Sequence, residues 1–138
     1  MSRTGYIDHV GISVPDLAAA KQYYDELMPI LGLKQWFKTT DGSFNYGPDG
    51  GRGTQLFFYQ ALEDGDYSQH RTGLQHIAFM VASRAIVREA HAWAVAQGAE
   101  ILHEPRLFPE YGPHQYATFW LDPHGFKLEA VCFAAERT

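Results

Sequence analysis

The chain has 138 residues, of which 46% are hydrophobic and 20% charged, and its formal net charge is −5 at pH 7. This length and composition are typical of one globular domain, and the negative charge argues against nucleic-acid binding. No apolar run reaches the roughly 18 residues of a membrane span, and the N-terminal sequence does not resemble a signal peptide. The single cysteine, Cys132, excludes an internal disulfide and a cysteine zinc cluster. We therefore expect a cytoplasmic protein.

The first half of the chain is predicted to form a strand, a helix and three further strands. Apolar alternation indicates the first strand, and Asp16 is a suitable N-cap for the helix, which Pro29 and Gly32 close. Turns rich in glycine separate the last three strands. The predicted elements are a strand over 6–14, a helix over 17–28, and strands over 34–40, 43–46 and 54–60.

The second half repeats this order after a polar, turn-rich linker over 61–73. Ser83 is the predicted N-cap of its helix, and Gly98 supplies the stop after it. The predicted elements are a strand over 74–81, a helix over 83–97, and strands over 101–108, 115–121 and 126–133.

The two halves form an internal repeat. When His9 is set on His76, the segment Asp8–Val14 aligns with Gln75–Val81, and the helices that follow align as well. Repeats of this kind generally pack as similar units. We therefore predict an α+β fold for the single domain 1–138. Its two tandem modules, 6–60 and 74–133, each have one helix that covers one face of a sheet.

Three ionisable residues are predicted to lie on the sheet faces that the helices leave open. His9 and His76 stand at equivalent places in the first strand of each half, opposite to the large apolar residues of those strands. Glu129 lies in the last strand, where an otherwise apolar setting requires a partner for its carboxylate. Two neutral imidazoles and one carboxylate form a facial triad for a divalent metal, with positions left for water or substrate. The alternative for each histidine is an ordinary core or surface side chain.

The strands around His9 and His76 and the closing segment Asp122–Glu129 resemble the vicinal oxygen chelate superfamily. That group includes glyoxalase I, fosfomycin-resistance proteins, extradiol dioxygenases and bleomycin-resistance proteins. The Asp-Pro-x-Gly-x-x-x-Glu motif, a tight turn followed by a strand, is the most specific part, and the similarity runs from Tyr6 to Phe133. It implies paired βαβββ modules with outer helices, whose sheets curl into a cup around a metal. It also implies His9, His76 and Glu129 as the metal ligands.

The sequence departs from glyoxalase I at one ligand. Glyoxalase I has a fourth ligand, a Glu on the last strand of its first module, whereas the segment 54–59 contains no carboxylate. By the repeat, Phe57 corresponds to Glu129, so true glyoxalase I activity is not expected. The remaining ligand set matches fosfomycin-resistance transferases and the catalytic half of extradiol dioxygenases, although the latter usually have four modules. Bleomycin-resistance proteins share the fold but lack the ligands.

Polar groups that could act beside the metal precede and begin the penultimate strand. His114 is a candidate general acid or base, and Tyr116 is a candidate hydrogen-bond donor to a bound oxygen. The alternative is an ordinary polar loop with an aromatic residue packed at its rim. Phe57 and Tyr59 are expected to line the cup as a substrate pocket, and Trp120 either lines it too or packs below it.

We therefore expect a metal-dependent enzyme of lyase, isomerase, transferase or dioxygenase type, which acts on a small oxygenated substrate. One divalent ion is expected per site, and iron, zinc, manganese, nickel and magnesium all stay open. The first alternative is a protein of the bleomycin-resistance type that sequesters a small molecule without metal, and the second is a metal with a structural role only. A homodimer is expected, and the cup forms either within one chain or between two swapped chains.

Overall fold

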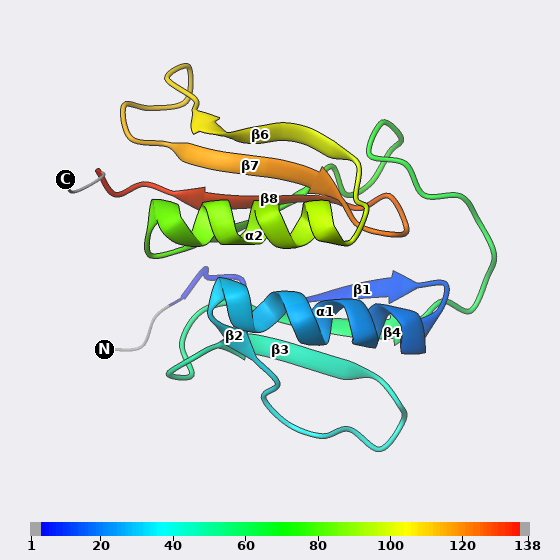
Figure 1. Cartoon of the computed structure of the whole chain (residues 1–138). Helices are drawn as coiled ribbons and strands as arrows, with labels where there is room; N and C mark the ends of the chain where they lie inside the picture. Colours follow the sequence, from blue (N-terminus) through cyan, green and yellow to red (C-terminus); the bar gives the residue numbers. More distant parts are fainter. Residues whose placement is uncertain (1–3, 136–138) are drawn as a thin grey trace. The chain divides into compact units, whose positions relative to one another are not determined.

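The structure is a computed structural model that describes residues 4–135 (Figure 1). The chain divides into two compact units, Met1–Asp64 and Gly65–Thr138, and the division falls inside the segment predicted as a linker. Each unit has the order strand, helix, strand, strand, strand and contains one four-stranded mixed sheet. The predicted α+β fold of two βαβββ modules is therefore confirmed. Within residues 4–135, neither helix combines the length and apolarity that a membrane crossing requires.

In the first unit, β1 pairs in parallel with β4, and β3 pairs in antiparallel fashion with both β4 and β2. The strand order across this sheet is β1-β4-β3-β2. The elements are β1 (His9–Val14), α1 (Leu17–Leu31), β2 (Leu33–Lys34), β3 (Phe44–Pro48) and β4 (Gln55–Gln60).

The predicted strand over 34–40 is wrong for most of its length, because β2 ends at Lys34. The fully buried side chain of Asn45 takes the place of a neighbouring strand. Its Oδ1 accepts hydrogen bonds from the backbone N–H groups of Trp36 and Phe37, each at 3.2 Å, and its Nδ2 donates to Phe37 O at 2.9 Å. A side chain that satisfies backbone groups in this way competes with the hydrogen-bond ladder of a sheet.

Helix α1 begins as predicted and ends three residues later than predicted. Asp16 caps it by accepting a hydrogen bond from Ala19 N at 3.1 Å. Pro29 does not close the helix but lies inside its last turn, and the stop is Gly32, whose φ of 91° is left-handed. Burial of Leu31 against the core favours the extra turn despite the hydrogen bond that proline removes.

In the second unit, β5 pairs in parallel with β8, which is also paired with β7 in the order β5-β8-β7-β6. Helix α2 begins after Ser83, whose side chain accepts a hydrogen bond from Ile86 N at 3.3 Å. His76 comes directly before β5 because this strand is shorter than predicted. The elements are β5 (Ile77–Met80), α2 (Arg84–Ala96), β6 (Ile101–Leu107), β7 (Tyr116–Leu121) and β8 (Lys127–Cys132).

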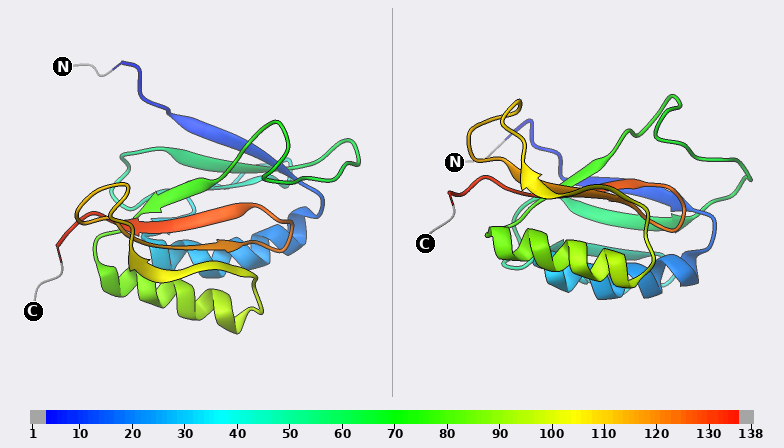
Figure 2. Two further views of the ribbon diagram at one scale, coloured as in Figure 1. Left: turned by 90° about the horizontal axis from the view of Figure 1, so that it is seen from above. Right: turned by 45° about the horizontal axis from the view of Figure 1, so that its top comes forward.

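Helix α2 covers one face of the second sheet, as Figures 1 and 2 show. Trp120 of β7 pairs with Leu128 of β8, and both side chains are fully buried. Phe119 pairs with Glu129 in the same two strands, and alternation turns these two side chains to the opposite face. The sheet thus separates a core under α2 from a second face that carries Glu129.

Candidate metal and substrate site

Glu129 and His76 form a close pair within the second unit. Strand β8 is central in its sheet, and the Glu129 side chain is almost completely buried, with 4% of its residue surface exposed. Oε1 of Glu129 lies 3.4 Å from Nε2 of His76. Among residues 4–135, no basic group other than this imidazole lies within ion-pair distance of the Glu129 carboxylate. The carboxylate also accepts no hydrogen bond from those residues. A buried carboxylate with so few partners carries a large desolvation cost.

Burial disfavours the charged form of both Glu129 and His76. Burial raises the pKa of Glu129 above its ordinary value, and the positive charge of Lys127 partly opposes that shift. Burial also lowers the pKa of His76, and Lys127 lowers it further. The imidazole is therefore neutral at pH 7. The ring nitrogen of His76 and the carboxylate oxygen of Glu129 together are suitable ligands for a cation.

The hydrogen bonds of the two histidines also fit metal binding. Nδ1 of His9 lies 2.8 Å from Oδ2 of Asp8, and Nδ1 of His76 is hydrogen-bonded to Oε1 of Gln75. In the neutral ring, an Nδ1–H that donates to an oxygen leaves the lone pair on Nε2. Ligating histidines commonly have such an acceptor on the ring nitrogen that does not bind the metal. The residue before each histidine supplies this acceptor in both halves of the repeat.

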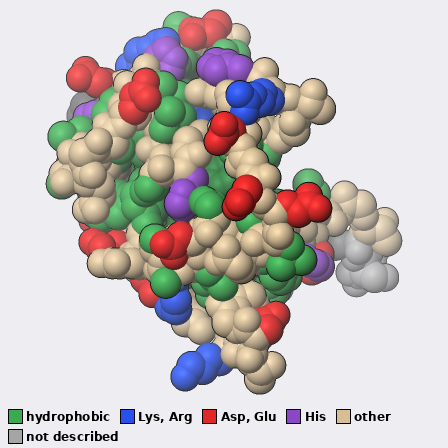
Figure 3. Space-filling view, turned by 90° about the vertical axis from the view of Figure 1, so that its right-hand side faces the viewer, with side chains coloured by type: hydrophobic (Ala, Val, Ile, Leu, Met, Phe, Trp, Pro, Cys, Tyr) green, Lys and Arg blue, Asp and Glu red, His purple; other side chains and the backbone are tan. Residues whose placement is uncertain are grey.

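The structure brings His76 and Glu129 together, whereas His9 belongs to the other unit. Taken unit by unit, residues 4–135 contain no group of three His, Cys, Asp or Glu side chains that could hold a metal ion. Figure 3 shows acidic side chains distributed over the face in view rather than gathered in one patch. The two ligands of the second unit therefore require at least one more donor from elsewhere.

His9 shares its sheet face with aromatic side chains. In the register of β1 and β4, Gly11 pairs with Phe57 and Ser13 with Tyr59, which puts both rings on the side of His9. The Phe57 ring centre lies 5.3 Å from that of His9 and 6.4 Å from that of Tyr59. Phe37, which the prediction of a strand over 34–40 did not place near the site, adds a third ring at 5.7 Å from Phe57. The first unit thus presents an aromatic surface beside one histidine.

Tyr116 and Trp120 lie on the face of their sheet that α2 covers. Trp120 is fully buried, and the guanidinium groups of Arg84 and Arg88 on α2 lie 5.1 Å and 5.8 Å from the Tyr116 ring centre. Glu129 is on the opposite face, so the structure brings neither residue to it. Trp120 was predicted either to line the cup or to pack below it, and the structure places it in the core under α2. His114 is exposed in the loop between β6 and β7.

Phe119 lies beside the pair, and two further residues of the second unit, Lys127 and His103, lie against Phe119. Phe119 is the cross-strand neighbour of Glu129, and its ring centre lies 6.2 Å from that of His76. Lys127 Nζ lies 5.1 Å from the Phe119 ring centre, and the His103 ring lies 5.5 Å from it. Alternation along β8 predicts Lys127 on the face of Glu129, and the structure confirms this. The register of β6 shifts on either side of His103, so alternation along the strand does not predict which face His103 occupies.

Comparisons with known proteins agree with this fold. The model of the Glyoxalase/Bleomycin resistance protein/Dioxygenase superfamily matches residues 6–130. A Bacillus halodurans protein provisionally described as a glyoxalase is 32% identical, with a TM-score of 0.78 and coverage of 94% of this chain and 96% of that one. An Albidiferax ferrireducens glyoxalase/bleomycin resistance protein, 22% identical, has a TM-score of 0.72 over 91% of this chain and 98% of that one, which shows the fold alone.

A sequence relative points the same way. The uncharacterised protein YqjT of Bacillus subtilis is 29% identical over 126 residues, which are 89% of this chain and 95% of the relative. With two βαβββ modules and a family match over nearly its whole length, the chain belongs to the glyoxalase/bleomycin resistance/dioxygenase superfamily, also called the vicinal oxygen chelate superfamily.

Proposed function

We propose that this protein is a metal-dependent enzyme of lyase, isomerase, transferase or dioxygenase type that acts on a small oxygenated molecule. One observation carries the proposal, namely the burial of Glu129 beside Nε2 of a neutral His76. Burial of this carboxylate lowers the stability of the metal-free protein, and a bound cation would offset that cost. A protein selected only for stability would gain by replacing Glu129 with an apolar residue, so its presence supports a functional role.

The proposed ligands are His9, His76 and Glu129, from one chain or from two chains that exchange modules. When bound, a divalent ion would supply Lewis acidity for a substrate with neighbouring oxygen atoms. The side chains of Asp8 and Gln75 orient the two imidazoles, and Glu129 supplies negative charge. The aromatic surface of the first unit would hold the apolar part of the substrate.

Of the two residues considered for proton transfer, only His114 keeps that role. His114 is exposed in the loop before β7, and it stays the candidate acid or base. Tyr116 lies over two arginines on the helix-covered face, and we do not assign it this role. We further propose that the protein is a homodimer, which light scattering of the full chain tests.

Metal content tests the proposal. Tag-free protein and the variants Glu129→Gln, His76→Ala and His9→Ala are dialysed against a panel of divalent ions and measured by plasma mass spectrometry. The expected result is about one ion per chain in the wild type and a large loss in every variant. Glu100→Gln, which removes an exposed carboxylate of the same unit, is the matched control. Equal metal content in the wild type and Glu129→Gln would refute the assignment.

A second candidate function is metal-free sequestration of an aromatic molecule. The observation that favours it is the group of neighbouring rings formed by Phe37, Phe57 and Tyr59, two of which are large exposed hydrophobics. Such a surface binds planar apolar ligands without any metal. If chelator-treated protein binds a ligand as tightly as untreated protein does, sequestration is the better account.

A further inference from the structure

Asn45 holds one ring of the aromatic surface, which Phe37, Phe57 and Tyr59 form in the first unit. Asn45 of β3 pairs with Phe57 of β4, so both side chains lie on the same face of the sheet. Its Oδ1 accepts hydrogen bonds from the N–H groups of Trp36 and Phe37 at 3.2 Å, and its Nδ2 donates to Phe37 O at 2.9 Å. One fully buried side chain thus fixes both the N–H and the C=O of Phe37.

The residue before Phe37 is anchored as well. Nε1 of Trp36 donates a hydrogen bond to Pro48 O at 3.4 Å. Gly47 makes this contact possible, because a Cβ atom at that position would collide with the indole ring of Trp36. Two consecutive residues of the segment are therefore held against β3, and the Phe37 side chain extends from a fixed backbone.

These contacts do not bury the Phe37 ring. Phe37 is 49% exposed and Tyr59 is 40% exposed. The ring centre of Phe37 nevertheless lies 5.7 Å from that of Phe57, which is itself 5.3 Å from that of His9. Contiguous exposed apolar side chains mark binding surfaces, and rigid support of such side chains lowers the entropy cost of binding. A buried amide that fixes an exposed ring adds little to the core, so its position indicates a role in binding.

Hydroxyl groups at the edge of the aromatic surface are available to a ligand. Among residues 4–135, the hydroxyls of Tyr59 and Ser13, which are paired in the register of β4 and β1, take part in no hydrogen bond. The Tyr59 ring lies against Gly11, where a Cβ atom would be 3.2 Å from its Cε2. Neighbouring rings with a few unpaired hydroxyls at their edge suit a planar ring that carries a polar substituent.

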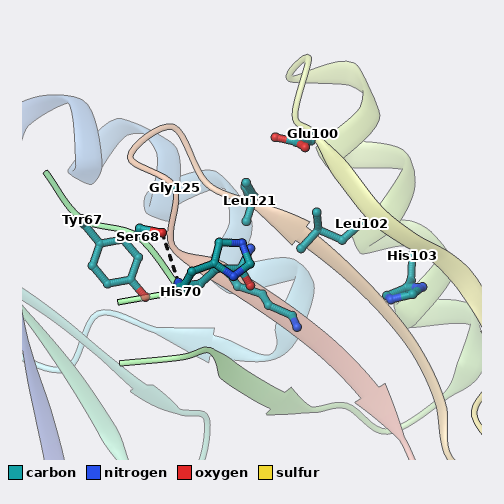
Figure 4. Close-up of a pocket in the computed structure, with 10 residues that line it drawn as sticks. Tyr67, Ser68, His70, Glu100, Leu102, His103, Leu121 and Gly125 are labelled. Carbon is teal, nitrogen blue, oxygen red and sulfur yellow. Dashed lines mark hydrogen bonds between the residues drawn. The ribbon is translucent and has the colours of Figure 1, made fainter. Parts of the chain in front are cut away.

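The second unit has a cavity of about 540 Å³ between its first residues and β6, β7 and β8 (Figure 4), but this cavity is lined differently. Its phenol ring, that of Tyr67, packs against Phe126 with the ring centres 4.4 Å apart. Neither His76 nor Glu129 belongs to its lining. The cavity therefore supplies no ring surface beside a proposed metal ligand, whereas the aromatic surface of the first unit contacts His9.

We propose that Asn45 is a positioning residue, which holds Phe37 beside Phe57 and so completes the binding site for a planar aromatic ring of the substrate. Asn45 does not touch the ligand and acts through Phe37. The assignment of this ring to the substrate rests on the proposed function, whereas binding of a ring to the aromatic surface requires no metal.

Binding of 2-naphthol to chelator-treated full-length protein tests the proposal. Dissociation constants are obtained from NMR shifts of the Phe57 and Tyr59 rings, and decahydro-2-naphthol is the saturated, non-planar counterpart. The wild type should bind 2-naphthol at least about tenfold more tightly than this counterpart. Phe37→Ala and Asn45→Ala should each weaken 2-naphthol binding about tenfold. The double variant should bind no more weakly than Phe37→Ala alone, because Asn45 acts through Phe37.

Two further variants make the test specific. Thr39→Val is the matched control, because it removes a hydrogen bond to Ser43 O that lies in the same segment and does not involve Phe37, and it should bind as the wild type does. Asn45→Asp keeps the shape and both acceptor contacts but loses the donor to Phe37 O. It should also weaken binding, and it tests the same role if Asn45→Ala does not fold.

Wild-type affinity in the folded Asn45 variants, or additive losses in the double variant, would overturn the positioning role. Equal binding of decahydro-2-naphthol would overturn the aromatic class of ligand. Metal content keeps the proposed function separate. Ring binding that depends on Asn45 in a protein that holds no metal would support the binding site and refute the metal assignment. Normal metal content without binding of 2-naphthol would refute the binding site alone.

Discussion

Phe57 and Glu129 occupy equivalent positions in the two modules. β4 pairs Phe57 with Gly11, and β8 pairs Glu129 with Ala78, the residue that aligns with Gly11 in the repeat. The same sheet position thus carries an aromatic ring in the first unit and a buried carboxylate in the second. The two modules therefore differ chemically at this position, with an aromatic side chain in one and a carboxylate in the other.

Replacing Phe57 with Glu should therefore add a ligand. Because the side chain lies 5.3 Å from His9, a carboxylate there is expected to raise the affinity for a divalent ion by about tenfold or more. Competition with a metal-binding dye measures the change. Tyr59→Glu, on the same face two residues further on, is the control, and an equal gain in that variant would show that general negative charge is responsible.

The metal-free protein should become more stable when Glu129 is changed to Gln. The substitution keeps the shape and removes a buried charge, so the free energy of unfolding is expected to rise by about 1–3 kcal/mol. With a saturating divalent ion the order should reverse, because only the wild type gains binding energy. Urea unfolding with and without chelator measures both. A metal-free Glu129→Gln protein that is less stable than the wild type would contradict the desolvation cost assigned to the buried carboxylate.

The pH dependence of stability follows from the same pair. Since the folded-state pKa of Glu129 lies above its ordinary 4.5, its contribution is fully present below that pH and is lost as the pH rises through the folded-state value. Since the pKa of His76 lies below 6.5, its contribution is present above 6.5 and is lost as the pH falls through the lowered value. Unfolding measured between about pH 4 and pH 8 in wild type and Glu129→Gln separates the two. An unchanged profile in the variant would contradict the assignment to Glu129.

Metal affinity should depend on the residues that precede the histidines. Changing Asp8 or Gln75 to Ala frees Nδ1 and lets the ring reorient, so the affinity is expected to fall about 10- to 100-fold. Dye competition again gives the values. Gln97→Ala, at the exposed end of α2, should have no effect. Unchanged affinity in both Asp8→Ala and Gln75→Ala would mean that Nε2 is not the ligating atom.

Trp120→Ala tests the core placement of that side chain. Full burial under α2 predicts a loss of about 3–5 kcal/mol in the free energy of unfolding. Tyr59→Ala, at a 40% exposed residue, should cost far less. If Trp120→Ala instead leaves stability intact and abolishes ligand binding, the residue lines a pocket after all.

Much of the fold was predictable because its signals are local. The repeat around His9 and His76, the helix caps Asp16 and Ser83, and alternation in β8 each depend on neighbouring residues. The failures have longer-range causes. Asn45 replaces a strand by side-chain hydrogen bonding, and burial of Leu31 carries α1 past a proline.

The site was predictable to a lesser degree for a related reason. Alternation correctly separates Glu129 from Leu128, but it cannot tell which face of β7 carries the cavity or that β6 shifts register around His103. Both Tyr116 and Lys127 are polar side chains at positions next to the predicted site. Only the packing of α2 over Tyr116 and of Phe119 under Lys127 distinguishes them.

The most direct test of the central claim is an anomalous diffraction experiment on crystals grown with the divalent ion that the protein retains. Data collected at the absorption edge of that ion should show one peak about 2.0–2.2 Å from Nε2 of His9, Nε2 of His76 and a carboxylate oxygen of Glu129, whether His9 comes from the same chain or a partner. A peak elsewhere, or none at Glu129 in crystals of metal-loaded protein, would contradict the claim.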